Sequence, residues 1–384
     1  MGMKVGINLL WMVPGVVGGS ETYTARLLHG LSERKADIEY TVFALPQLAS
    51  AHPDLVTKFE VAFAPLTGQW KSFRVAGENS WLAAQTRKRG IDVIHHGGGI
   101  VPIMPSSRPI VTIHDLQYLF YPEYFTRAKR TYLRRMVPRS AEAARLILTP
   151  SEYTRRTVIE RLNIDPSVVV VVPHGISLRD ESHEKADVRA RFDIPGPFFL
   201  YPAAVYPHKN HLVLIDGFAR LLKAHPDASL VLTGPKGWTE WKTATDMERR
   251  LTQEIDRLDL SARVKRLGYV SAKDLDALYR EATALVFPSR FEGFGAPVLE
   301  AMSRGCPVLA ADATATPEVV MDAGRLVSPD NSEEWARGMS DLIEDEELRA
   351  DLKKRGLERA REFEWTRSAG ILEDCYRFVL ETTL

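Results

Sequence analysis

The sequence predicts an α/β protein of two domains, each with a parallel sheet wrapped by helices. The chain has 384 residues, more than one ordinary hydrophobic core holds, so two domains are expected. Short apolar runs alternate with helical patterns along the chain, which is typical of parallel sheets. Several of these runs end in glycine-containing loops, at the edge where such sheets bind their ligands.

Six apolar runs predict the strands of the first domain. The first is followed by a loop that contains Gly18 and Gly19, and then by an amphipathic helical run from Thr22 to Ser32. Ser20 is a plausible N-cap of that helix, and the two glycines allow backbone to approach a ligand closely. A plain flexible turn explains the same glycines. The predicted strands are Val5–Leu10, Tyr40–Leu45, Asp92–His95, Ile110–Ile113, Leu146–Leu148 and Val168–Val172.

Composition indicates a globular chain without a preference for nucleic acid. Lys plus Arg and Asp plus Glu each number 50, so no net charge favours a polyanion. The two cysteines, Cys306 and Cys375, lack metal-ligand spacing and are expected to be reduced thiols. The first residues enter a predicted strand at once, which leaves no room for a signal peptide. No apolar run approaches the length of a membrane span, so we expect a cytoplasmic protein.

Polar residues stand where three of these strands end. His114 and Asp115 follow the strand that ends at Ile113, and His174 follows the last strand of the domain. A lone histidine is often a structural residue, but this position favours a ligand site. His95 and His96 could bind a metal, although no third ligand accompanies them at a suitable spacing. We expect their glycine-rich loop to line the ligand site instead.

The stretch from Thr126 to Ser140 is a basic amphipathic helix candidate. Tyr132, Leu133, Met136 and Val137 form its apolar side. It is either a solvated helix face or a surface that attaches to an anionic membrane, where each basic residue contributes about 1 kcal/mol. It contains no acidic residue, and its cations are Arg127, Lys129, Arg130, Arg134, Arg135 and Arg139.

The stretch from Ser289 to Gly305 organises the second domain. A buried strand is predicted at Ala284–Phe287, and a helix from Gly295 to Arg304, with Pro297 tolerated in its first turn. The first N–H groups of a helix lack intrahelical partners and attract anions, so this loop suits a phosphate. Glu292 lies in the loop and Glu300 on the helix. Two solvated glutamates are the simpler interpretation of this pair.

This stretch resembles the E-x₇-E signature of retaining GT-B glycosyltransferases, in particular glycosyltransferase family 4. The likeness spans nearly the whole chain in the family's order. It includes Gly-Cys-Pro-Val from Gly305, Pro-Glu-Val from Pro317, Val-Thr-Ile-His-Asp-Leu from Val111, Pro-His-Gly-Ile from Pro173 and Pro-His-Lys-Asn-His from Pro207. The family has Asn where this chain has His174.

The resemblance implies two Rossmann-like domains that face a central cleft. We expect an acceptor-side domain at residues 1–180, completed by a returning C-terminal helix at 366–384. A nucleotide-sugar-binding domain is expected at 195–365. The polar stretch from Ser182 to Asp193 would be a linker or a short bridging helix.

The resemblance also implies roles for individual residues in a retaining sugar transfer that requires no metal or cofactor, since the nucleotide-sugar is the co-substrate. The family's catalytic residues correspond to His114, Lys209 and Glu292. Asp115 would orient His114, and Glu300 would bind the ribose. The remaining expected substrate- or nucleotide-binding residues are Gly18, Gly19, His208, Gly234, Gly293, Phe294 and Gly295.

One departure from the family concerns the diphosphate clamp. The family's usual Arg beside the Lys is replaced by Ala204, and His208 is expected to compensate in part. The branch that shares Pro-His-Lys-Asn-His suggests GDP-mannose as the donor, with a glycan or a lipid-linked molecule as the acceptor. The alternatives are a GT-B epimerase or hydrolase, and a non-catalytic GT-B binding module.

Overall fold

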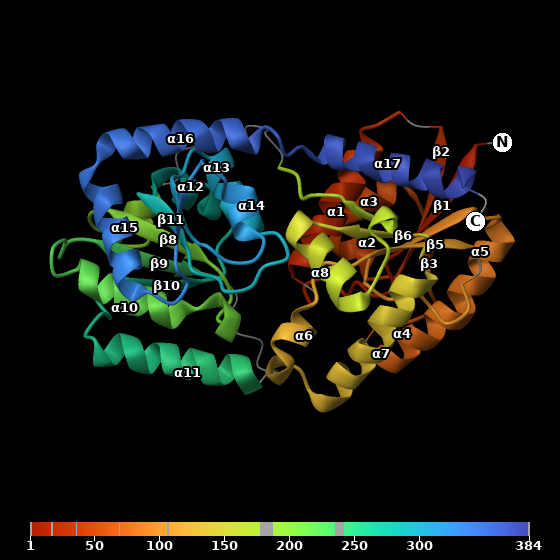
Figure 1. Ribbon diagram of the computed structural model, residues 1–384, viewed down its shortest axis with the longest axis horizontal. Coiled ribbons are helices and arrows are strands. Elements are labelled where there is room, and N and C mark those ends of the chain that lie inside the picture. The colour runs from red at the N-terminus through yellow and green to blue at the C-terminus, as the bar shows by residue number, and fades with distance from the viewer. Residues whose placement is uncertain are drawn as a thin grey trace. The chain divides into compact units, whose positions relative to one another are not determined.

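The computed structural model describes residues 2–16, 18–35, 37–68, 70–105, 107–176, 187–234 and 242–382. The chain forms two compact units (Figure 1). Unit 1 comprises Met1–Gly175 together with Phe363–Leu384, and unit 2 comprises Ile176–Glu362. Each unit is built around a sheet in which all strand pairs are parallel, so the predicted α/β class with two Rossmann-like sheets is confirmed.

The sheet of unit 1 has seven strands in the order β3-β2-β1-β4-β5-β6-β7. Its central strands are almost entirely buried, as is usual for a parallel sheet covered on both faces. The strand β3 was not expected, because its four residues include a glutamate and lie at the sheet edge. The bounds are β1 (Met3–Asn8), β2 (Ile38–Ala44), β3 (Glu60–Phe63), β4 (Val93–His96), β5 (Arg108–Thr112), β6 (Leu146–Thr149) and β7 (Val169–Val171).

The helices of unit 1 connect these strands. The first of them begins at Gly19 with Gly18 as its N-cap, so the expected N-cap at Ser20 is wrong. The chain turns at Gly18, whose φ of 66° suits glycine, and Ser20 falls within the first turn. The bounds are α1 (Gly19–Ser32), α2 (Leu48–Ala51), α3 (Pro53–Lys58), α4 (Lys71–Gly77), α5 (Ala83–Arg89), α6 (Gln117–Phe120), α7 (Arg127–Ala143), α8 (Glu152–Leu162) and α17 (Trp365–Glu381). A π-helical turn at Glu78–Leu82 joins α4 to α5.

The returning helix α17 completes the core of unit 1 by packing against α1 (Figure 1). Leu372 and Tyr376 of α17 are buried in the same cluster as Leu28 of α1 and Val5 of β1. A Cβ at Gly30 would lie 2.5 Å from the backbone oxygen of Trp365. The close approach of α1 and α17 therefore depends on a glycine at this position, and the expected return of the C-terminal helix is confirmed.

The sheet of unit 2 has six strands in the order β10-β9-β8-β11-β12-β13. The strands are β8 (Phe198–Pro202), β9 (Ser229–Thr233), β10 (Val264–Gly268), β11 (Ala284–Phe287), β12 (Val308–Ala311) and β13 (Arg325–Val327). The helices are α9 (Val188–Arg191), α10 (His211–Leu221), α11 (Lys242–Arg257), α12 (Ala272–Glu281), α13 (Ala296–Ser303), α14 (Thr316–Val320), α15 (Ser332–Glu344) and α16 (Glu346–Ala360). The short helix α9 falls within the stretch expected to link the domains, and residues 182–186 of that stretch lie outside the described residues.

This topology brings the expected site residues to one edge of each sheet. In unit 2 the neighbouring strands β8 and β11 run parallel, so the loops that follow them meet at the carboxyl edge. In unit 1 the loops after β1, β4 and β5 share the carboxyl edge for the same reason. The candidate site is therefore described as two edges, one in each unit.

Candidate functional site

The turn into α13 lies at the carboxyl edge of unit 2. Gly295 precedes the helix with φ of 99°, a left-handed conformation that suits glycine, and Pro297 lies in the first turn. The backbone N–H of Glu292 donates to Thr314 Oγ1 at 3.0 Å, which fixes the start of the loop. Phe294 is buried in the unit, so only its backbone is available to a ligand. The positive end of α13 is thus presented by Gly293–Gly295.

Lys209 reaches the same loop from the neighbouring strand. It ends the 3₁₀ turn Pro207–Lys209 after β8, and its backbone oxygen accepts a hydrogen bond from Tyr201 Oη at 2.7 Å. Its Nζ lies 2.6 Å from Glu292 Oε1, and the two side chains are only 20% and 13% exposed. Lys209 is therefore not the exposed surface residue that its position before a helix suggests. It is a semi-buried cation held beside the helix start.

His208 and Ala204 decide how much further charge this edge offers. The His208 ring stacks on Tyr206, with 5.8 Å between the ring centroids and 8° between their planes. Burial, followed by the charge of Lys209, holds the pKa of His208 well below its ordinary value. The imidazole is neutral at pH 7, so it can form hydrogen bonds but does not replace the cation missing at Ala204. Of the neighbouring residues His208 and Lys209, it is Lys209 that brings a positive charge to this edge.

Glu300 is held by a tyrosine of the preceding helix. Tyr279 Oη donates to Glu300 Oε2 at 3.1 Å. Burial, together with the Glu300 carboxylate, raises the pKa of Tyr279 well above its ordinary value, so the hydroxyl keeps its proton and remains a donor. This hydrogen bond restrains the carboxylate of Glu300 on α13. A restrained carboxylate can form directional hydrogen bonds with two neighbouring hydroxyl groups of a ligand.

Gly234 allows two strand ends of unit 2 to approach each other. It follows β9 with φ of 139°, and a Cβ there would lie 2.8 Å from the carbonyl of Ala203. Its N–H donates to Gly268 at the end of β10. The glycine is needed for this packing, and it brings backbone of the β8 and β9 loops to the same edge. Residues 235–241 beyond it lie outside the described residues.

In unit 1, His114 follows β5 and is partly exposed. Its Nε2 lies 3.0 Å from the carbonyl oxygen of Gly97. Because a carbonyl only accepts, Nε2 carries the proton and Nδ1 presents a lone pair. The ring packs edge-on against Tyr23 at 5.3 Å, and burial lowers the pKa of His114 to about 4. His114 is thus a neutral residue that can accept a hydrogen bond from a hydroxyl.

The other expected residues of unit 1 lie along the same edge. Asp115 is exposed, and its Oδ1 accepts a hydrogen bond from the backbone N–H of Gln117 at 2.8 Å, where α6 begins. The bond that orients His114 is the one to Gly97. A Cβ at Gly18 or Gly19 would meet nothing within 4 Å, so the backbone before α1 is open to approach.

His95 and His96 are structural residues, which corrects the expectation that they line a ligand loop. Both belong to β4 and are buried. His95 bonds Tyr376 Oη at 2.9 Å and Thr112 Oγ1 at 2.7 Å, so it connects the sheet to α17. Within the described ranges, no three His, Cys, Asp or Glu side chains are grouped to hold a metal ion.

A buried polar cluster that could not be predicted from the sequence lies at the ends of β1 and β4. The Nδ2 of Asn8 lies 3.0 Å from Glu78 Oε1 and 3.1 Å from His96 Nδ1. Its Oδ1 accepts from the backbone N–H of Leu10, which assigns the amide and makes Nδ2 the donor to both neighbours. Burial raises the pKa of Glu78 to about 7. Only the fold brings these three residues together.

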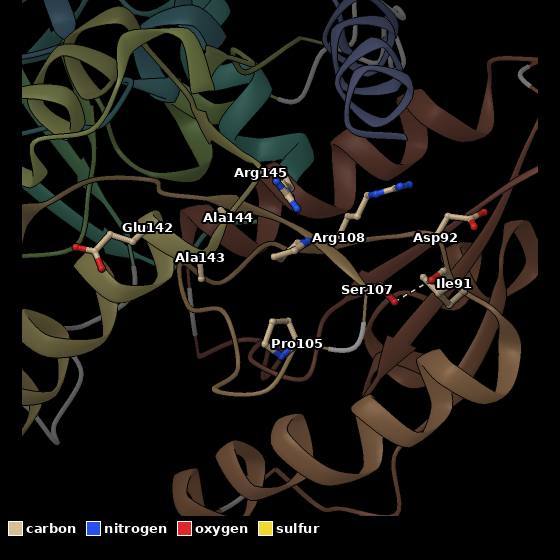
Figure 2. A pocket seen from close by; sticks show the side chains of 10 residues that line it. Ile91, Asp92, Pro105, Ser107, Arg108, Glu142, Ala143, Ala144 and Arg145 are labelled. Carbon is tan, nitrogen blue, oxygen red and sulfur yellow. Dashed lines mark hydrogen bonds between the residues drawn. The ribbon is translucent and has the colours of Figure 1, made fainter. Parts of the chain in front are cut away.

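One hollow of unit 1 lies away from the carboxyl edge of its sheet. It has a volume of about 720 Å³ and is found where β4, β5 and β6 begin. Figure 2 shows Arg108, Arg145 and Asp92 among its lining residues. None of the expected site residues lines it. Because ligands of parallel sheets bind beyond the carboxyl ends of the strands, this hollow at the amino ends is not part of the candidate site.

Comparison with known proteins gives a consistent result for both units. Residues 17–180 match the model of Glycosyltransferase Family 4, and residues 184–359 match that of Glycosyl transferases group 1. The O-antigen chain mannosyltransferase B of Escherichia coli is 30% identical over 279 residues, which cover 71% of each chain. The D-inositol 3-phosphate glycosyltransferase of Salinispora tropica is 26% identical over 401 residues, covering 94% of this chain and 81% of the relative.

A solved structure of Anabaena Alr3699/HepE in complex with UDP and glucose has a TM-score of 0.76. It is 20% identical and covers 98% of this chain and 100% of that one. At this identity the likeness shows the fold, which is the two-unit GT-B fold expected from the sequence.

Proposed function

Because this chain belongs to the group 1 glycosyltransferases of family 4, a retaining family of hexosyltransferases, we propose that it moves mannose from GDP-mannose to a glycan or a lipid-linked acceptor. The transfer of a sugar from a nucleotide-sugar follows from the family. The sugar, the base and the acceptor are the proposed parts. The name of the Escherichia coli relative, a mannosyltransferase, supports the choice of sugar.

The observation that carries the mechanism is the Lys209–Glu292 pair at the start of α13. As the bond to the sugar breaks, negative charge develops on the leaving diphosphate and positive charge on the anomeric carbon. We assign Lys209 and the N–H groups of Gly293–Gly295 to stabilising the negative charge on the leaving diphosphate. Fixed donors of this kind typically contribute 10²–10³-fold to turnover each. Because these groups supply the neutralisation, the scheme needs no metal ion.

The two glutamate carboxylates are assigned to hydrogen bonds with hydroxyl groups of the donor. We assign Glu292 to the sugar hydroxyls near the anomeric carbon and Glu300, restrained by Tyr279, to the ribose hydroxyls. Gly234 and His208 contribute backbone and neutral hydrogen-bonding groups around the nucleotide. Bound diphosphate competes with Glu292 for Lys209, which leaves the carboxylate available to the sugar.

The expected site residues of unit 1 are assigned to binding the acceptor. The Nδ1 lone pair of His114 is suited to a sugar or acceptor hydroxyl. Gly18 and Gly19 allow close approach of the substrate, and Asp115 adds an exposed carboxylate at the same edge. Retention of configuration means that the acceptor oxygen attaches to the face from which the diphosphate leaves.

We propose that the enzyme works in the cytoplasm, at the inner face of the membrane. The described cysteines, Cys306 and Cys375, are buried free thiols, as in reducing compartments. No helix of the described residues is long and apolar enough to cross a bilayer. A lipid-linked acceptor would be met at the membrane surface, and the basic helix α7 is the element assigned to that contact.

Ligand-detected NMR with a panel of nucleotide-sugars tests the donor. GDP-mannose is expected to show saturation transfer, and Glu300→Ala is expected to require a higher concentration of GDP-mannose to reach the same signal. The anomeric configuration of the transfer product is then determined, and it is expected to match that of the donor. Binding of a uridine or adenosine sugar in place of GDP-mannose would contradict the donor assignment. A product of inverted configuration would contradict the mechanism.

A further inference from the structure

The segment that follows β12 has an unusual backbone conformation at the carboxyl edge of unit 2. Thr314, three residues beyond the end of β12, has a φ of 53°, in the left-handed region. Apart from glycine, six of the described residues have a positive φ, and four of them are Asn or Asp, which tolerate this region. Thr is β-branched, so Thr314 is an outlier. Strain of this kind is concentrated at functional sites.

The strained segment lies against the loop that contains Glu292. The strand β12 is the parallel neighbour of β11, so the loops after these two strands leave the sheet side by side. The Oγ1 of Thr314 accepts a hydrogen bond from the backbone N–H of Glu292 at 3.0 Å. Nearer to α13, a Cβ on Gly295 would lie 3.9 Å from Thr316 Oγ1. The conformation of Thr314 is therefore tied to the start of the turn into α13.

The hydroxyl of Thr314 still has a proton to donate. A threonine hydroxyl has one donor and two acceptor sites, and the bond from Glu292 uses an acceptor site. Among the residues that the structure describes, none accepts the proton of this hydroxyl within hydrogen-bond distance. Thr314 is partly exposed, so a ligand at this edge can reach it. A hydroxyl that accepts one hydrogen bond is polarised and becomes a better donor.

We propose that Thr314 is a further residue of the donor site, whose hydroxyl donates a hydrogen bond to an oxygen of the transferred sugar. The sugar is chosen over the diphosphate because Thr314 bonds the backbone of Glu292, the residue assigned to the sugar hydroxyls. One hydroxyl then holds the Glu292 loop and contacts the substrate, which gives the strained backbone a purpose. The inference deepens the proposed function and rests on it, since the place of Glu292 beside the sugar is itself proposed.

Thr314→Ser and Thr314→Ala form a matched pair that tests the hydroxyl. Both variants lack the γ-methyl group, so they differ from each other in the hydroxyl alone. Thr314→Ser is expected to transfer sugar at a rate close to that of wild type. Thr314→Ala is expected to be about tenfold slower, the scale of one hydrogen bond between neutral groups. Steady-state kinetics of the full chain with GDP-mannose measures the difference.

Calorimetry with two ligands shows which part of the donor the hydroxyl contacts. Relative to Thr314→Ser, Thr314→Ala is expected to bind GDP-mannose several-fold more weakly and to bind GDP, which lacks the sugar, equally well. If the panel of nucleotide-sugars selects another donor, that nucleotide-sugar and its own nucleoside diphosphate replace this pair. A wrong choice of base or sugar therefore does not affect the test.

Glu292→Gln separates this inference from the proposed function. The substitution keeps the backbone N–H that Thr314 accepts and removes the charge of the carboxylate. Wild-type turnover of Glu292→Gln, together with an intact difference between Thr314→Ser and Thr314→Ala, would overturn the role proposed for Glu292 and leave Thr314 in the site.

Two glycine variants test the backbone strain separately from the hydroxyl. Met321 also has a positive φ, of 46°, and its side chain is 59% exposed beyond the end of α14. Glycine adopts such a φ without strain, so Thr314→Gly and Met321→Gly are both expected to fold. Met321→Gly is expected to keep the turnover of wild type, whereas Thr314→Gly is expected to lose as much as Thr314→Ala. Denaturant unfolding of every variant gives its stability.

Three results would overturn the proposal. Equal turnover by the Ser, Ala and Gly variants of Thr314 would show that the hydroxyl contacts no substrate. A loss of turnover that follows the unfolding midpoint from variant to variant would make the bond to Glu292 purely structural. Equal weakening of GDP and GDP-mannose in Thr314→Ala would move the contact from the sugar to the nucleotide.

Discussion

Lys209 and Glu292, 83 positions apart in the sequence, form an ion pair of 2.6 Å between Nζ and Oε1 at the carboxyl edge of unit 2. The pair exists because β8 and β11 are neighbours, so the turn after one strand meets the loop after the other. Each side chain restrains the other beside the start of α13. If the donor binds at this edge, as we propose, the restrained side chains reduce the entropy lost on binding.

Lys209→Met is expected to lower turnover about a hundredfold or more, because it removes one fixed donor to the leaving group. The loss is expected mainly in turnover, because the diphosphate gains further negative charge as it leaves, and a smaller loss of nucleotide affinity is expected because the bound diphosphate is already anionic. Steady-state kinetics with the preferred donor provides the measurement. A variant that folds normally and transfers sugar at the parental rate would show that the backbone N–H groups suffice.

The same substitution is expected to lower stability by about 1–3 kcal/mol, because it leaves Glu292 semi-buried without its partner. Adding Glu292→Gln to Lys209→Met removes the unpaired charge and is expected to recover part of that loss. Denaturant unfolding of the two single variants and the double variant measures the coupling. Additive losses would mean that the pair contributes nothing to stability.

Glu300→Ala is expected to weaken nucleotide-sugar binding by about 1.5–3 kcal/mol, the typical contribution of a hydrogen bond to a charged group. Isothermal titration calorimetry provides the affinity. Tyr279→Phe keeps the carboxylate but removes the bond that restrains it, so a smaller loss is expected. Unchanged affinity of Glu300→Ala would remove the ribose assignment.

Glu78 is expected to make the stability of the protein depend on pH. Burial raises the pKa of Glu78 from its ordinary value of 4.5 to about 7, so the folded protein binds the proton more tightly than the unfolded chain. The stability linked to Glu78 is fully present below pH 4.5 and is lost as the pH rises through 7. Glu78→Gln is therefore expected to be more stable than wild type at pH 8, by up to about 3 kcal/mol.

Chemical denaturation at pH 5 and pH 8 measures this difference. Glu142→Gln makes the same change at an exposed position on α7 and is the control. An advantage of Glu78→Gln that does not grow between pH 5 and pH 8 would contradict the buried-carboxyl explanation.

Gly30→Ala is expected to destabilise unit 1 by about 1–3 kcal/mol, the usual cost of overpacking. The new Cβ would lie 2.5 Å from the backbone oxygen of Trp365, and backbone cannot rotate away as a side chain can. Gly370→Ala on α17 is the control, because its nearest neighbour is the side chain of Arg34. Denaturant unfolding is expected to show the loss for the first variant alone.

The sequence was sufficient to predict the strands that are buried on both faces, because runs such as Leu146–Leu148 and Ala284–Phe287 are uniformly apolar. It did not predict the edge strands β3 and β13. Glu60–Phe63 and Arg325–Val327 are short, partly exposed and begin with a charged residue, so neither a continuous apolar run nor strict alternation marks them. Edge strands depend on the neighbour that they pair with, and the sequence does not show that neighbour.

For the candidate site, local signals were sufficient to predict the turn and the helix start after Gly293–Gly295, because one loop contributes all of these residues. They were insufficient where the contact joins distant segments. The Lys209–Glu292 pair and the bonds of Asn8 to Glu78 and His96 are of this kind. His95 was misinterpreted for the same reason, because its partner Tyr376 is 281 positions away.

The position of α17 has a consequence for how the protein is made. The core of unit 1 includes Leu372 and Tyr376, whereas unit 2 is one uninterrupted segment from Ile176 to Glu362. A ribosome synthesises the chain from the N-terminus, so the later unit has all of its residues before the earlier one does. During translation the apolar surface of α1 that faces α17 stays without its partner until nearly the whole chain has emerged. Unit 1, although it begins first, is therefore expected to finish folding last.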